Sequence, residues 1–424
     1  MYEINKITSS TVVDFAAEEL KKYLRMMMPR CGDIHIKYNK DAQIGFRLGL
    51  MSDFEISADE ARDTELDDIL HIDTTDSGGI IAGSNERCVL LAVYRFLREN
   101  GCRWFFPGVD GEYIPICDIR PTKYHKMADN RFRGQCNEGS EAQQNMLESI
   151  DFAPKIGLNV YMLEFDIPYY YYNMWYSHIG NKFKEKETIT KDNVLQWKRM
   201  CETEMAKRGM QFHDMGHGWT SESFGFDSSE GWADRFKNEI LPDKDKGKFI
   251  AQINGNRKFH MNVPLNTNFC MSNPEAREKV VNYIADYAQK QNNVDFLHIW
   301  LADSSNNHCE CSECVKKTTA DWYVILLNEI DDEFTKRYLH TRLVFIAYQD
   351  LLWSPETEII KNPDRYSLLF APITRIYTES YATDADMDSY AGYKRNKLKL
   401  PNGMAENLAC LKKWQEKYNG TCMA

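Results

Sequence analysis

The sequence lacks long apolar runs, clusters of basic residues and low-complexity stretches. No apolar run in the 424 residues approaches the roughly eighteen residues that a membrane-spanning helix needs, so no membrane span is predicted. Acidic residues outnumber basic ones by 63 to 52, and the formal net charge is −11. Because phosphate groups are bound by clustered Lys and Arg, this balance argues against a nucleic-acid partner or an anionic membrane surface. The 43% hydrophobic content suffices for the cores of two or three globular domains.

The first ten residues, MYEINKITSS, lack the basic start, apolar segment and cleavage site of a signal peptide. The chain as given is therefore expected to be cytoplasmic, whereas a trimmed N-terminus would allow a periplasmic or secreted protein. The twelve cysteines are scattered and do not form the dense framework of a small disulfide-rich secreted domain. Most of them are expected to be free or buried thiols.

Residues 1–127 have the pattern of a small α/β domain. Apolar residues at helical spacing predict helices over 12–28 and 88–100, and the alternating segments between them predict strands. The glycines at positions 78, 79 and 83 match neither the Walker spacing nor the dinucleotide-binding spacing. We therefore interpret them as strand and turn glycines.

From residue 128 onward a strand and a helix alternate, which predicts a parallel sheet. Strands are predicted over 132–136, 158–165, 210–215, 296–301, 343–348 and 367–371, and helices over 193–208, 274–291 and 320–338. Six strands fit either a doubly wound sheet or most of an eight-stranded barrel. A further helix at 408–418 and the opening of a strand at 421–424 end the chain. A barrel would then lack its last two strands, and the chain would be a fragment of a longer protein.

Polar and aromatic side chains gather where the predicted strands end. Aromatic rings stack on the CH faces of sugars, and carboxylate, amide and guanidinium groups hydrogen-bond sugar hydroxyls. The set predicts a carbohydrate site formed by Arg133, Glu164, His217, Trp219, Trp300, Asp303, Asn306, Tyr348, Arg375 and Glu379. Simpler alternatives stay open for three of these residues: a turn cap for Asp303, an ion pair for Arg375 and a solvent carboxylate for Glu379.

Two neighbouring features have open interpretations. The four consecutive tyrosines at 169–172 either line the site or line a loop or partner interface. His213 and His217 are four residues apart, a spacing that would serve one metal ion on a helix. The glycine-interrupted segment around them, MQFHDMGHGW, instead resembles a strand, which argues against a catalytic metal there.

The segment 296–314, FLHIWLADSSNNHCECSEC, combines an apolar strand, Asp303 and a Cys-x-Cys-x-x-Cys cluster. In α/β barrels, catalytic groups lie where a strand passes into its loop, which is the predicted position of Asp303. Cys309, Cys311 and Cys314 need one further ligand for tetrahedral zinc, and Cys270 is the candidate from the preceding loop. A structural zinc, a disulfide pair and free thiols all remain possible. Neither a catalytic cysteine nor a catalytic cofactor is indicated.

The N-terminal region resembles a known domain type. The segments FAAEELKKYL and GGIIAGSNERCVLLAVYRFLRENGCRWFFPGVDGEYIP resemble the small non-catalytic α/β domain that precedes the barrel in family 20 β-hexosaminidases and family 67 α-glucuronidases. Together with FCMSNPEAR, HIWLADSSNNHCECSEC and IAYQDLLWSP, they make essentially the whole chain resemble a bacterial family known as a domain of unknown function. Some of its members were placed in glycoside hydrolase family 163, endo-β-N-acetylglucosaminidases that act on complex N-glycans.

This resemblance implies a non-catalytic α/β domain over 1–127 and a (β/α)8 TIM-type barrel over 128–424, incomplete at its C-terminus. It also implies hydrolysis of a glycosidic bond next to N-acetylglucosamine, in an oligosaccharide or a glycoprotein glycan. In family 20 the acetamido oxygen of the substrate attacks the anomeric carbon, so the enzyme supplies an acid and a carboxylate that orients the amide. The Asp-Glu pair of that family reads Ala302-Asp303-Ser304 here, which leaves one role unfilled locally.

The resemblance implies that Asp303 orients the acetamido group or acts as the acid. A second carboxylate, Glu164 first and Glu379 second, would take the other role, while Tyr348 holds the acetamido group and Trp300 forms the floor of the pocket. Two alternatives remain. An α-glucuronidase-like enzyme would need a cation for the uronate, for which Arg375 is the obvious candidate, and a non-catalytic carbohydrate-binding protein could use the same scaffold.

Overall fold

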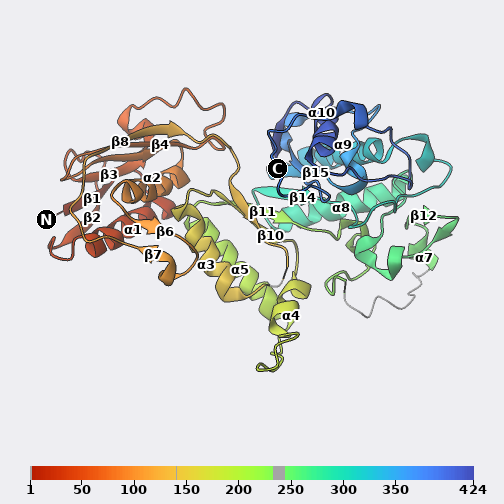
Figure 1. Cartoon of the computed structure of the whole chain (residues 1–424), viewed down its shortest axis with the longest axis horizontal. Helices are drawn as coiled ribbons and strands as arrows, with labels where there is room; N and C mark the ends of the chain where they lie inside the picture. Colours follow the sequence, from red (N-terminus) through yellow and green to blue (C-terminus); the bar gives the residue numbers. More distant parts are fainter. Residues whose placement is uncertain (1, 140, 233–243) are drawn as a thin grey trace. The chain divides into compact units, whose positions relative to one another are not determined.

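A computed structural model describes residues 2–139, 141–232 and 244–424 (Figure 1). Contacts divide the chain into two compact units. The first comprises Met1–Leu163 and Tyr171–Phe212, and the second comprises Glu164–Tyr170 and His213–Ala424. The domain boundary that we expect at residue 127 stays a prediction.

The first unit contains a six-stranded sheet in the order β2-β1-β3-β5-β4-β8. The strands are β1 (Tyr2–Lys6), β2 (Ile34–Tyr38), β3 (Phe46–Leu50), β4 (Ile69–Thr74), β5 (Gly79–Gly83) and β8 (Thr122–Met127). The first four strands in this order pair in parallel, whereas β4 runs antiparallel to both β5 and β8. The glycines at 79 and 83 thus lie in a strand, which confirms their interpretation as structural.

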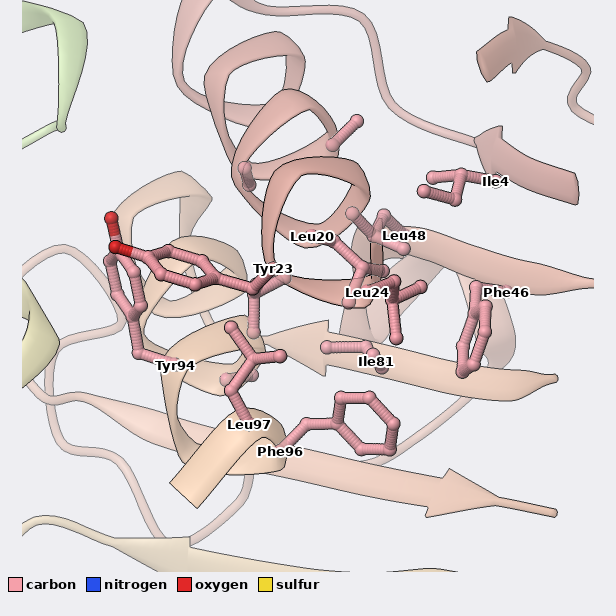
Figure 2. Close-up of a cluster of buried hydrophobic side chains, with 14 of the residues drawn as sticks. Ile4, Leu20, Tyr23, Leu24, Phe46, Leu48, Ile81, Tyr94, Phe96 and Leu97 are labelled. Carbon is pink, nitrogen blue, oxygen red and sulfur yellow. The ribbon is translucent and has the colours of Figure 1, made fainter. Parts of the chain in front are cut away.

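Two amphipathic helices, α1 (Thr11–Met27) and α2 (Glu86–Glu99), pack against this sheet and form a hydrophobic core with it. Each begins at a polar side chain, Ser10 or Asn85, that accepts a hydrogen bond from a backbone N–H of the first turn. Leu24, Phe96 and Phe46 are fully buried where the two helices meet the sheet (Figure 2). The unit also contains β6 (Arg103–Trp104), β7 (Glu112–Tyr113), β9 (Gly134–Cys136), α3 (Gln143–Lys155) and α5 (Lys191–Lys207). It contains β10 (Val160–Glu164) as well, except for its last residue, Glu164, which belongs to the second unit.

The second unit contains five parallel strands that pair in chain order: β11 (Gln211–Met215), β14 (Phe296–Ile299), β15 (Arg342–Ala347), β16 (Tyr366–Phe370) and β17 (Thr421–Met423). Helices α8 (Pro274–Lys290), α9 (Thr319–Lys336) and α10 (Met404–Gln415) lie on the connections. The middle strands are almost entirely buried, as expected for parallel strands covered on both faces. This is a parallel half-barrel sheet, consistent with an incomplete TIM-type barrel.

Most predicted elements agree with the structure to within a few residues. The strictly sequential order of the strands favours the barrel over a doubly wound sheet, in which the order reverses. The four tyrosines at 169–172 lie in a short helix, α4 (Tyr169–Tyr176), in which Tyr172 is buried and donates a hydrogen bond to Gln143. Within the described ranges, no helix combines the length and apolar character needed to cross a membrane.

Candidate functional site

Asp303, Tyr348 and His217 meet in the second unit, each just beyond a parallel strand. The carboxyl ends of parallel strands lie at one edge of the sheet, so the loops after β14, β15 and β11 converge there. The Tyr348 hydroxyl donates a hydrogen bond of 2.8 Å to Asp303 Oδ1. His217 Nε2 lies 3.7 Å from the same oxygen. Three strand-end residues that the sequence predicts as site residues are therefore in contact.

The environment of His217 fixes its hydrogen bonding. Its Nδ1 lies 2.6 Å from the Leu301 carbonyl oxygen, and because a carbonyl only accepts, this nitrogen carries a proton. The imidazole ring lies 5.2 Å from the Trp300 ring and 6.2 Å from the Tyr348 ring. The side chain of His217 is 8% exposed and that of Asp303 is 28% exposed. The Asp303 carboxylate is therefore accessible to a ligand, while its imidazole neighbour is held in place.

Glu164, the last residue of β10, lies against Gly216, in the loop that follows β11. It is 6% exposed. A Cβ atom added to Gly216 would lie 2.2 Å from Glu164 Oε2, so the carboxylate occupies the space that a side chain would need. The following backbone N–H, of Phe165, donates to the Met215 carbonyl oxygen. Glu164 and Asp303 thus lie beside successive residues of one turn, Gly216 and His217.

Arg133 and Trp219 make other contacts in the structure, and their assignment to the site stays a prediction. Arg133 lies in the first unit, where its guanidinium donates to Asp68 at 2.6 Å and to the Gly157 carbonyl oxygen at 2.9 Å. Trp219 is 1% exposed, donates to the His298 carbonyl oxygen and stacks on Phe165. Both side chains are committed to structural contacts.

Asn306, Arg375 and Glu379 are also held by other contacts. The Asn306 side chain exchanges two hydrogen bonds with the backbone of Leu398. The Arg375 guanidinium lies 4.6 Å from the ring of Tyr381 and donates to its hydroxyl. Glu379 accepts a 2.6 Å hydrogen bond from the first backbone N–H of α10, where a carboxylate is stabilised by the helix dipole. This capping role favours Glu164 over Glu379 as the second carboxylate.

His213 pairs with a residue other than His217. Its Nδ1 lies 3.0 Å from Nε2 of His298 on the neighbouring strand, and both residues are fully buried. Burial lowers the pKa of His298 to about 3 and holds the pKa of His213 well below its usual range. The two rings therefore form a neutral hydrogen-bonded pair inside the sheet. This agrees with the expectation that His213 and His217 do not share a metal.

Sequence reasoning did not select one carboxylate beside the site, Asp350. It is 1% exposed, accepts the Asn306 backbone N–H at 2.8 Å and lies 3.9 Å from His308 Nε2. Burial raises the pKa of Asp350 to about 6, and burial lowers the pKa of His308 to about 3. Its position just after the strand at 343–348 was the available signal, but the sequence does not show that this carboxylate is buried.

The Asp350→Asn variant is expected to be more stable than the wild type above pH 6. The raised pKa means that the folded state binds a proton more tightly than the unfolded state, so wild-type stability falls as the pH rises from about 4 to about 6. This shift corresponds to about 3 kcal/mol, which the neutral amide does not lose. Denaturant unfolding at pH 4, 6 and 8 measures it. Parallel stability curves for the two proteins would contradict the prediction.

Four cysteines form a compact cluster in the second unit. The sulfur atoms of Cys270, Cys309, Cys311 and Cys314 all lie within 4.8 Å of one another. Cys270 Sγ lies 3.6 Å from Cys311 Sγ and 3.8 Å from Cys314 Sγ. Sulfur ligands about 2.3 Å from a tetrahedral zinc ion are roughly 3.8 Å apart, so the spacing fits that ion.

Backbone N–H groups also face these sulfurs. The N–H of Gln252 lies 3.3 Å from Cys309 Sγ, and that of Ser272 lies 3.4 Å from Cys314 Sγ. Such donors stabilise thiolates, the form in which cysteine binds metal. All twelve cysteines are free thiols in the structure. The cluster could hold a metal ion, with Cys270 as the fourth ligand that the sequence suggested.

Three comparisons relate the chain to known proteins. The family model described as "Domain of unknown function (DUF4838)" matches residues 127–395. A search of curated proteins finds no match to the sequence.

Several solved glycoside hydrolases resemble the structure at low identity. CpGH84D is 10% identical over 87% of this chain, with a TM-score of 0.42. A family 89 enzyme from Clostridium perfringens, solved with GlcNAc-α-1,4-galactose, is 12% identical over 84% of this chain, with a TM-score of 0.47. The chain spans 52% of the length of the first and 39% of the second. A family 20 β-N-acetylhexosaminidase from Streptomyces coelicolor A3(2) is 12% identical over 96% of this chain and 80% of its own, with a TM-score of 0.43. Likenesses this distant say nothing of activity.

Proposed function

The chain belongs to the DUF4838 family, and we propose that this member is a glycoside hydrolase that acts on N-acetylglucosamine-containing glycans by a substrate-assisted retaining mechanism. The observation that carries the proposal is the Tyr348–Asp303 pair, joined by a 2.8 Å hydrogen bond at the carboxyl ends of two strands. It offers one hydroxyl donor beside one carboxylate acceptor. An acetamido group needs that combination, because its N–H donates and its carbonyl oxygen accepts.

In this mechanism Asp303 accepts the acetamido N–H, and the Tyr348 hydroxyl turns its single proton from Asp303 to the acetamido carbonyl oxygen. That oxygen attacks the anomeric carbon as the glycosidic bond breaks, and no nucleophile from the protein is needed. The imidazole ring of His217 packs beside the carboxylate, with Nε2 3.7 Å from Asp303 Oδ1. The indole N–H of Trp300 is buried and has no hydrogen-bond partner within the part of the chain that the structure describes.

Glu164 takes the role of the acid. It donates its proton to the departing glycosidic oxygen and then accepts a proton from the water that opens the bicyclic intermediate. Glu164 is 6% exposed, and its carboxylate lies beside Gly216, the residue that precedes His217.

A structural zinc ion in the four-cysteine cluster is part of the proposal. Its ligands would be Cys270, Cys309, Cys311 and Cys314, with no position left open for a catalytic water. The ion would supply cross-linking of loops and no chemistry at the sugar. A uronate-specific alternative would use the Arg375 guanidinium, which donates to the Tyr381 hydroxyl through one of its nitrogens.

The test is calorimetric titration of the full-length protein with N-acetylglucosamine-thiazoline, which mimics the bicyclic intermediate, together with turnover of an aryl β-N-acetylglucosaminide. Binding and turnover are expected in the wild type. Binding without turnover would favour a non-catalytic carbohydrate-binding protein. A folded protein that does neither would contradict the proposal.

The Gly216→Ala variant is expected to lower kcat by about a hundredfold, since a displacement of about 1 Å at a catalytic group has that effect. The new Cβ atom would lie 2.2 Å from Glu164 Oε2 and would force the carboxylate to move. Gly255→Ala is the matched control, because Gly255 also has a positive φ of 78° but no heavy atom within 4 Å of the added Cβ. Steady-state kinetics of both variants measure the effect, and equal losses would exclude the steric explanation.

A further inference from the structure

We infer that the metal held by the four cysteines fixes the position of Asp303, and that Asn268 and Asn307 are the positioning residues that connect the two. The inference rests on the proposed function for the role of Asp303, and on hydrogen bonds in the structure for the connection. It concerns the loop from Trp300 to Glu313, which contains no helix or strand. Such a loop takes its shape from contacts with other segments.

One segment, residues 265–270, contacts this loop along its length. At one end, the Leu265 carbonyl oxygen accepts the backbone N–H of Asp303 at 2.9 Å. At the other end, Cys270 contributes its sulfur to the cysteine cluster, 3.6 Å from Cys311 Sγ. This short segment therefore connects the backbone of Asp303 to the cysteines of the cluster.

Asn268, in the middle of this segment, links the same two regions through its side chain. It is 1% exposed, and its Oδ1 accepts the backbone N–H of Ala302 at 3.2 Å. Its Nδ2 donates to Oδ1 of Asn307 at 2.8 Å. Ala302 precedes Asp303 directly, and Asn307 is two residues before Cys309.

Asn307, in the loop, also donates a hydrogen bond back to segment 265–270. It is fully buried, and its Nδ2 donates to the Asn266 carbonyl oxygen at 2.8 Å. The loop is therefore bonded to segment 265–270 at Ala302, Asp303 and Asn307. These buried amide groups are satisfied only while the segment and the loop keep their present register.

The cysteines set that register. Cys270 is 39 to 44 residues from the other three in the sequence, and thiolates repel one another unless a cation lies between them. Zinc would convert this repulsion into a cross-link between the segment and the loop. Loss of zinc would release both ends of the network, and the Asp303 carboxylate would lose its fixed orientation.

Amide hydrogen exchange of the full-length chain tests this inference without relying on turnover. Removal of zinc with a chelator, or the Cys311→Ser variant, is expected to speed exchange in a peptide covering residues 301–309 by at least tenfold. Exchange in a peptide covering β15, residues 343–347, should change little. Unchanged exchange at 301–309 after zinc loss, or equal acceleration in both peptides, would overturn the inference.

The Asn268→Ala variant tests the path. It should accelerate exchange at 301–309 and lower kcat with little change in KM, while the zinc content stays at the wild-type level. Asn328→Ala is the matched control, because Asn328 is also buried and bonds two backbone groups, those of Ile359 and Lys361, away from this loop. The control should leave exchange at 301–309 unchanged.

Combining Cys311→Ser with Asn268→Ala should accelerate exchange at 301–309 no more than the stronger single variant, because both changes interrupt one path. Fully additive acceleration would overturn the inference. A wild type that shows the expected exchange pattern but neither binds nor hydrolyses substrate would contradict only the proposed function. Normal hydrolysis together with zinc-independent exchange would contradict only the connection to the metal.

Discussion

Replacing Asp303 with asparagine is expected to lower kcat by at least about a hundredfold while the protein stays folded, since a single electrostatic or proton-transfer group contributes on the order of 10²–10⁴. Asparagine keeps the shape of the side chain and an oxygen that can accept from Tyr348, whose hydroxyl is 2.8 Å from Asp303 Oδ1. It removes the negative charge that orients the acetamido group and stabilises the positive charge that develops on it. The loss should therefore concern catalysis more than stability.

Three measurements on the full-length protein check this: turnover of an aryl β-N-acetylglucosaminide, thiazoline binding and thermal unfolding. Thiazoline affinity is expected to fall together with kcat, because the ligand resembles the intermediate that Asp303 stabilises. Asp364→Asn is the matched control, since Asp364 is exposed and precedes β16, at the opposite end of the sheet. Near-normal turnover in Asp303→Asn would remove this residue from the mechanism.

The Cys314→Ala variant is expected to lose tightly bound zinc and to unfold more readily. If free zinc exceeds its dissociation constant about a thousandfold, loss of the site lowers the free energy of unfolding by about 4 kcal/mol. Cys314 is 1% exposed and lies 3.8 Å from Cys270 Sγ, so its removal takes one ligand from the centre of the cluster. Elemental analysis should show one zinc per wild-type chain and less in the variant.

Cys410→Ala provides the control for the loss of a buried thiol. Cys410 is 2% exposed in the same unit and lies outside the four-cysteine cluster. Its replacement leaves a similar small cavity, so its effect on stability measures packing alone. If both variants lose the same stability and the wild type carries no zinc, the four cysteines are free thiols.

The elements that the sequence predicted well are those specified by local patterns. The helix predicted over 12–28 is α1, Thr11–Met27, because its apolar spacing and its Ser10 cap are both encoded within a few residues. The strands at 296–301 and 343–348 were found for the same reason, since a short apolar run bounded by polar residues is a local feature. Local pattern also placed Asp303 and Tyr348 at strand ends.

The contacts that the sequence did not show come from partners that are distant in the sequence. Arg133 follows the pattern of a strand-end site residue, but its guanidinium is bound by Asp68, 65 residues earlier. Glu379 reads as a free carboxylate until α10 brings the backbone N–H of Met404 to it. Periodicity specifies the end of a strand at which a side chain lies, but not which other segment reaches it.

By itself, the sequence determined the acidic globular character of the chain, its alternation of strands and helices, and the cysteine spacing that suggests a metal site. It also supplied Asp303 and Tyr348 as candidates. Only the tertiary structure decided that Tyr348 and His217 share Asp303, that Glu164 lies against Gly216, and that Cys270 joins the other three cysteines. The physical reason is that strand and helix patterns are set by near neighbours, whereas contacts between strand ends depend on the register and packing of segments up to about a hundred residues apart.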